Sequence, residues 1–159
     1  MELHILIRIP LLLIPFGFII KYRTLLVSLI TRIKLPAILL ALISSIPLII
    51  FEEHINCGAF GCTGVFLPPT LMFLLILELL FFLILKVLPI KKVVSQTIFL
   101  SLLGFVFEFT AGSASTDLHS LLFANPLIFL FILLWVGMSY AFVLYIPLLV
   151  IKAKQTQNL

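Results

Sequence analysis

The stretch 126-PLIFLFILLWVGMSYAFVLYIPLLV-150 runs without a single charged side chain. An α-helix rises about 1.5 Å per residue, so about 20 apolar residues cross the roughly 30 Å hydrocarbon core of a membrane. The stretch therefore predicts a transmembrane helix. Of the 159 residues, 64% are hydrophobic and 10% are charged, with a mean hydropathy of +1.38. Water-soluble domains carry far more polar surface, so we expect a single polytopic membrane domain over residues 1–159.

Five apolar segments are expected to cross the membrane. They lie near residues 5–20, 35–52, 69–89, 93–112 and 126–150. The segments lack the two-residue alternation of membrane β-strands and are about twice as long as such strands. Helices satisfy their own backbone hydrogen bonds in lipid. The fold class predicted is therefore an all-α integral membrane protein, a bundle of about five transmembrane helices.

Prolines and one short link refine this expectation. The first segment is short and is interrupted by Pro10 and Pro15, so it is either a tilted span or a re-entrant segment. Pro126 stands at the start of the fifth segment, where a missing backbone N–H costs nothing. The link 89-PIKK-92 is very short and predicts a tight antiparallel hairpin of the third and fourth segments.

Basic residues predict the orientation of the chain. Five alternating spans place nine of them on one side: Lys21, Arg23, Arg32, Lys34, Lys86, Lys91, Lys92, Lys152 and Lys154. The positive-inside rule assigns that side to the cytoplasm. We therefore expect a multi-pass protein of the cell membrane, with its N-terminus outside and its C-terminus in the cytoplasm. The pI near 9.3 then reflects topology signals, and no nucleic-acid partner is expected.

Acidic residues and histidines gather toward the opposite side. These are Glu2, Glu52, Glu53, Glu108, Asp117, His4, His54 and His119. The positive-inside rule hardly constrains acidic residues, so their position is additional information. It predicts an outward-facing polar cluster.

The stretch 52-EEHIN-56 ends the second segment. If the helix continues through it, Glu52 and Glu53 both share a face with Asn56. Adjacent carboxylates repel one another in a low dielectric, so one of the two could serve as an acid or base near neutral pH. The alternative is that both are solvated at the membrane interface, where a carboxylate costs little free energy.

Glu78 interrupts 71-LMFLLILELLFFLIL-85 near the middle of the membrane. An ionised carboxylate there costs roughly 2.5–3.5 kcal/mol on insertion scales, so Glu78 should face the bundle and be protonated or paired. Arg8 is its natural partner, and the pair would be either a structural clamp or a functional centre. Glu108, about one turn below the outer end of the fourth segment, could approach Glu78 or Arg8.

The two cysteines leave three alternatives open. Cys57 and Cys62 could form a disulfide on an oxidising outer face. They could bind zinc together with His54 and His119, although H-x2-C-x4-C is not a recognised zinc pattern. Cys62 could instead be a free nucleophile with His119 as its base. His119 alone is otherwise a solvated loop residue.

The third alternative resembles the exosortase and archaeosortase transpeptidases over about half of the chain. Those proteins carry a C-[ST]-G motif at the outer start of a helix, then a helix ending in a catalytic arginine, then an outer histidine. Here 62-CTG-64 precedes the third segment and His119 precedes the fifth. The resemblance implies transpeptidation with Cys62 as nucleophile. Glu108 stands where the arginine is expected, and this departure removes a group that would complete such a site.

Three functions remain open from the residues alone. The favoured one is a non-catalytic membrane subunit or interaction protein, which binds another membrane protein. The alternative is an outer-leaflet enzyme acting on a lipid or a membrane-tethered peptide. Its candidate catalytic residues are Glu53, Glu78, Glu108, Cys62 and His119. A third function is a proton-coupled carrier using Glu78 and Glu108, although five spans without an internal repeat are few for a carrier. No cofactor and no resident metal are expected.

Overall fold

The computed structural model of the chain describes residues 3–60, 68–110, 119 and 125–157. These residues are almost entirely helical, and the described part contains no strand. The helices are α1 (Leu3–Thr31), α2 (Ala37–Phe60), α3 (Pro68–Val87), α4 (Val93–Thr110) and α6 (Pro126–Gln157). The predicted all-α bundle is confirmed. Within the described residues, α1, α2, α4 and α6 are each long and apolar enough to cross a membrane, as expected of a multi-pass membrane protein.

The first helix is longer than the sequence led us to expect. α1 is continuous over 29 residues and contains both Pro10 and Pro15. Prolines are tolerated in membrane helices because neighbouring groups satisfy the carbonyls that they leave free. Lys21 and Arg23, which fall between the first two expected spans, lie within α1. Lysine and arginine are good helix formers, so they do not end the helix.

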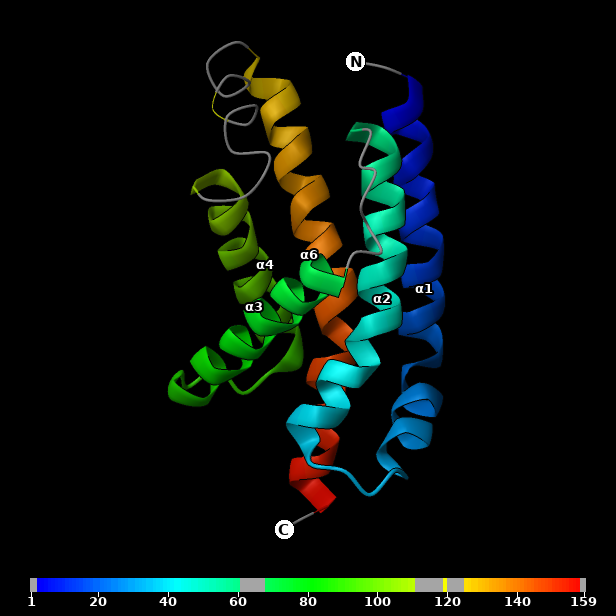
Figure 1. Cartoon of the computed structure of the whole chain (residues 1–159), viewed down its shortest axis with the longest axis vertical. Helices are drawn as coiled ribbons and strands as arrows, with labels where there is room; N and C mark the ends of the chain where they lie inside the picture. Colours follow the sequence, from blue (N-terminus) through cyan, green and yellow to red (C-terminus); the bar gives the residue numbers. More distant parts are fainter. Residues whose placement is uncertain (1–2, 61–67, 111–118, 120–124, 158–159) are drawn as a thin grey trace.

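α6 is the helix on which α1, α2 and α4 all pack (Figure 1). One of its faces, with Leu144 and Leu148, is buried in an apolar cluster with side chains of α2, α3 and α4. Ile146 and Val150 are buried in a second cluster with Leu40 of α2 and with side chains of α1. The exposed side of α6 is largely apolar as well, which suits a helix that crosses a membrane.

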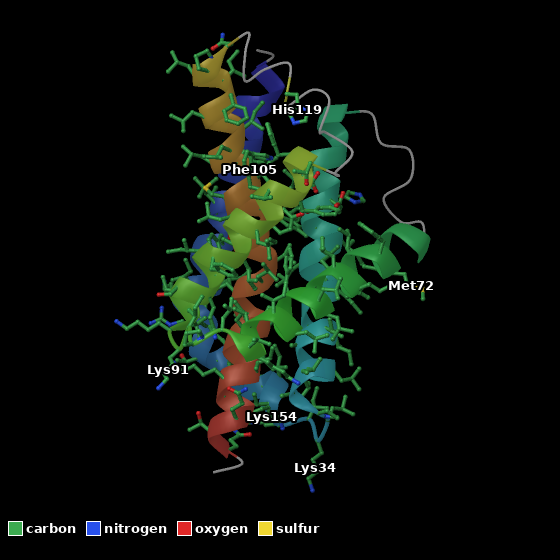
Figure 2. All side chains as sticks on the ribbon, turned by 90° about the vertical axis from the view of Figure 1, so that its left-hand side faces the viewer. Lys34, Met72, Lys91, Phe105, His119 and Lys154 are labelled. Carbon is green, nitrogen blue, oxygen red and sulfur yellow. The ribbon has the colours of Figure 1, made fainter. Side chains whose placement is uncertain are left out.

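α3 takes a different direction from the other helices. Both views show it running obliquely across the bundle (Figures 1 and 2), and its main partner is α2, whereas α4 packs on α6. The tight hairpin expected of the third and fourth segments is therefore open. The link at 88–92 is not helical, and Pro89 favours an extended conformation in the residue before it, which redirects the chain.

The two ends of the bundle differ in charge. Figure 2 shows Lys34, Lys91 and Lys154 toward one end, which we call the basic end, and His119 toward the other. The N- and C-termini also lie at opposite ends (Figure 1). The lysines marked in the figure thus lie on one side of the apolar region, as the sequence predicted.

Gly104 allows α4 to approach α6 closely. A Cβ atom at this position would lie 2.6 Å from three carbons of the Tyr140 ring. Non-bonded carbon atoms prefer about 3.5–4 Å. The aromatic ring of α6 therefore rests directly on the backbone of α4, and small residues serve this purpose at many helix contacts in membranes.

We expect Gly104→Ala to lower the free energy of unfolding in detergent by about 1–3 kcal/mol, because the added methyl group overpacks the contact with Tyr140. Gly137→Ala on α6 is the matched control, since a Cβ there meets nothing within 4 Å. The control should be neutral or stabilising, because alanine is the better helix former. Equal stability of the two variants would show that the close α4–α6 contact contributes nothing.

Candidate functional site

Polar side chains of three helices meet near the C-terminal ends of α2 and α4. We call this group the polar cluster. It comprises Glu52 and Asn56 of α2, Glu108 of α4, and Trp135, Ser139 and Tyr140 of α6. It lies toward the end of the bundle opposite the basic end, because Phe109, next to Glu108, is in ring contact with His119.

A chain of hydrogen bonds joins α2 to α6. The indole Nε1–H of Trp135 donates to Asn56 Oδ1 at 2.9 Å. The Asn56 amide donates in turn to Glu52 Oε1 and, at 3.5 Å, to Ser139 Oγ. Ser139 is also hydrogen-bonded to the Glu52 carboxyl group. Glu52 and Asn56 are four residues apart on α2, and Trp135 and Ser139 are four residues apart on α6. Each pair therefore lies on one face of its helix, and the two faces meet.

A second contact joins α4 to α6. The hydroxyl of Tyr140 donates to Glu108 Oε1 at 3.2 Å. Gly104 and Glu108 are one helical turn apart, so the ring that rests on Gly104 directs its hydroxyl toward Glu108. The glycine thus positions the tyrosine that binds the carboxylate.

Three carboxylates converge on this region. Glu52 is repelled by both Glu53 and Glu108, and Glu53 is repelled by Glu108. Glu52 is only 8% exposed, whereas Glu53 is half-buried and has further interactions of its own. Two of the expected candidates, Glu53 and Glu108, are therefore brought together. Of the adjacent residues Glu52 and Glu53, the buried one is Glu52, which is not among the candidate catalytic residues expected from the sequence.

A signal for Glu52 is present in the sequence. The buried residues of α2 include Ala41, Ser45, Ile49 and Glu52, spaced by four, four and three. This is the period of one helix face. Glu52 continues the face that carries Ser45, and Glu53 does not. Choosing Glu52 over Glu53 from the sequence would have required knowing that the helix continues to Asn56. The apolar length of the segment alone does not show this.

Glu78 forms a separate site. Its Oε2 is hydrogen-bonded to Ser45 of α2, and the side chain is only 3% exposed. No charged group among the described residues acts on it. The side chain of Arg8, its expected partner, lies outside the described residues. Glu108, the other expected neighbour, is bonded to Tyr140.

The remaining candidates lie at the surface or outside the described part. His119 is exposed and packs edge-on against the Phe109 ring, with 4.2 Å between centroids. Cys62 and the side chain of Cys57 lie outside the described residues, and so do the expected disulfide and the cysteine ligands of the expected zinc site. In the described part, no three His, Cys, Asp or Glu side chains form a group that could hold a metal ion.

The cluster can hold a cationic group. Carboxylates supply the negative charge, while Asn56, Ser139 and Tyr140 fix the carboxylates of Glu52 and Glu108 through hydrogen bonds. Charged groups interact more strongly in an apolar bundle than in water, because the dielectric is lower. A positive group placed among these carboxylates would relieve their mutual repulsion.

Trp135 is the only tryptophan of the chain, so its fluorescence reports on the cluster. We expect Asn56→Ala to shift its emission to shorter wavelength, because the indole N–H loses its acceptor. The same change should lower the free energy of unfolding by about 1–3 kcal/mol, since polar groups of Trp135 and Glu52 lose a partner. Ser44→Ala is the control, because Ser44 bonds to Ala41 O in its own helix. An unshifted emission in Asn56→Ala would contradict the network.

The resemblance to exosortases gains no support from this geometry. Residues 62–64, which carry it, lie outside the described residues, and Glu108 is engaged with Tyr140. The fold and the cluster are those of a multi-pass membrane protein whose polar side chains meet between helices. No protein-family model, no curated protein and no solved structure matches the chain.

Proposed function

We propose that the chain is a non-catalytic membrane interaction protein, which binds a cationic side chain of a partner membrane protein at its polar cluster. The observation that carries the proposal is the convergence of Glu52 and Glu108, from different helices, in an apolar bundle. Glu53 adds a third carboxylate at the same place.

Electrostatics favours a cationic partner. An ionised carboxylate inside a membrane requires a counter-charge or a proton, because burying an unpaired charge costs several kcal/mol. Among the described residues, the electrostatic neighbours of Glu52 are acidic, and the Glu108 carboxylate is held by a neutral tyrosine. A lysine or arginine from another membrane-spanning segment would supply the missing positive charge.

The surface beside the cluster suits a helix of a partner protein. Leu134 precedes Trp135 on α6 and is 59% exposed, and Phe51 precedes Glu52 and is also exposed. Apolar side chains at these positions can pack against a neighbouring membrane helix by van der Waals contact. A partner helix with one basic residue among apolar ones therefore matches both the charge and the surface.

The same proposal includes an orientation. Lys34, Lys91 and Lys154 mark the basic end, and the positive-inside rule would place that end in the cytoplasm. The polar cluster would then lie in the outer half of the membrane. The partner is accordingly expected to carry its basic residue in the outer leaflet.

A photo-crosslinking residue placed at Leu134 tests the partner. We expect an adduct with a membrane segment that carries a lysine or arginine at membrane depth. The adduct should be lost in the E52Q/E108Q double variant, which removes the negative charge while keeping the side-chain shapes. It should persist in E78Q, because Glu78 is remote from the cluster's charges. The measurement is mass spectrometry of the crosslinked product at equal membrane abundance.

A crosslinker at Val87 is the position control, since Val87 is 85% exposed but follows Lys86 toward the basic end. The proposal fails if the Leu134 adduct survives E52Q/E108Q, or if neutralising the basic residue of the partner leaves the adduct unchanged. Lipid as the sole adduct at Leu134 would also count against a protein partner.

Tags on the two termini test the orientation. A membrane-impermeant protease added to intact cells should remove the N-terminal tag and leave the C-terminal tag. Reversal of this pattern, or equal accessibility of both tags, would contradict the assignment of the basic end to the cytoplasm. Opening the cells should make both tags accessible, which controls for tags that are merely buried.

A further inference from the structure

The Glu78 carboxyl group lies at the crossing of α3 on α2, away from the polar cluster. Its partner Ser45 is completely buried, and so is Ala41, one turn earlier on α2. Phe81 and Phe82, one turn after Glu78, belong to the apolar cluster that also contains Ala41. The carboxyl group is therefore buried beside an apolar cluster, and in the described part of the chain its hydrogen-bond partner is the Ser45 hydroxyl group.

Among the described residues, no charge on a neighbouring helix balances an ionised Glu78. The titratable groups on the surrounding helices are Glu52 on α2, two turns beyond Ser45, Tyr140 on α6, whose ring contacts Phe81, and Glu108 on α4. On α3 itself there is Lys86, two turns further on. None of these acts on Glu78 among the described residues. An ionised carboxylate would be unpaired here, and its burial would be costly.

The number of hydrogens available for the two bonds of Ser45 also indicates that Glu78 is protonated. Ser45 Oγ lies 2.7 Å from the carbonyl oxygen of Leu42 and is also bonded to Glu78 Oε2. A serine hydroxyl has one hydrogen, and a carbonyl oxygen can only accept. Both bonds have a hydrogen at the same time only if Glu78 is a carboxylic acid that donates to Ser45, while Ser45 donates to Leu42.

The other oxygen of the carboxyl group fits this arrangement. Glu78 Oε1 is buried and has no hydrogen-bond partner in the described part of the chain. Leaving a neutral carbonyl oxygen without a partner costs less than leaving a charged carboxylate oxygen without one. A protonated Glu78 therefore satisfies the crossing better than an ionised one on every count.

We propose that Glu78 is a proton-binding site, and that the proton it binds holds α3 against α2. Release of the proton to water leaves a carboxylate on Glu78 and removes the hydrogen that joins it to Ser45. The charge then has no partner at the crossing, and α3 moves away from α2. α2 is the main partner of α3 in the bundle, so a charge at this crossing acts on the contact that places α3.

Infrared spectroscopy of the full chain in lipid bilayers tests the proton. At neutral pH, subtracting the E78Q spectrum from that of the wild-type protein should leave the C=O stretching band of a protonated carboxylic acid. The band should fall in frequency in D2O and disappear at alkaline pH. S45A should shift the band, because the carboxylic acid loses its acceptor, and this variant keeps the test valid if E78Q does not fold. Absence of the band from the difference spectrum, or an unchanged band in S45A, would overturn the proposal.

Spin labels at Ile43 of α2 and Leu80 of α3 test the movement, since both positions are exposed. A background in which Cys57 and Cys62 are replaced by serine confines the labels to these two sites. The distance between the labels should increase over the pH range in which the infrared band disappears. E78Q is the control and should keep the short distance at all pH values. A wild-type distance that stays constant through that range would refute the link between the proton and the packing of α3.

Discussion

Hydrogen bonds between polar side chains of neighbouring helices fix how the helices of this apolar bundle meet. Asn56 bonds to Trp135, Glu108 to Tyr140, and Glu78 to Ser45. Each bond joins a different pair of helices. Lipid offers no water to replace a lost partner, so a rotation of any of these helices would leave a buried polar atom unsatisfied. The polar side chains therefore set the faces on which otherwise uniformly apolar helices pack.

α6 lies at the centre of the bundle because it makes a different kind of contact with each of its neighbours, α4, α2 and α1. Toward α4 it presents Tyr140, whose ring fits the space left by Gly104. Toward α2 it presents Ser139 and Trp135, and toward α1 it buries Ile146 and Val150. Van der Waals packing holds membrane helices together, since lipid is as apolar as their side chains. Close contact at Gly104 and directional bonds at the cluster thus provide specificity that apolar surface alone cannot.

Hydropathy predicted the helices well and their contacts poorly. The apolar runs located the helices because length and composition are properties of a single segment. The extension of α1 past Lys21 and the oblique course of α3 depend on neighbours and on the link at Pro89, which local composition does not encode. Glu108 and Glu53 were correctly expected at one end. Glu52 was expected in the same cluster but was not chosen as a catalytic candidate, because its burial depends on which face of α2 meets α6, and only the packed bundle decides that.

The two carboxylate sites show how one residue type acquires different chemistry from its surroundings. At the polar cluster, carboxylates crowd together, and hydrogen-bond donors of α2 and α6 hold two of them in place, an arrangement that a positive group would complete. Glu78 is hydrogen-bonded to one hydroxyl group, beside the apolar cluster that contains Phe81 and Phe82, and a proton would neutralise it without displacing that packing. The first site lies between helices toward the end of the bundle opposite the basic end. The second lies where two helices cross, so a change in its charge acts on the fold itself.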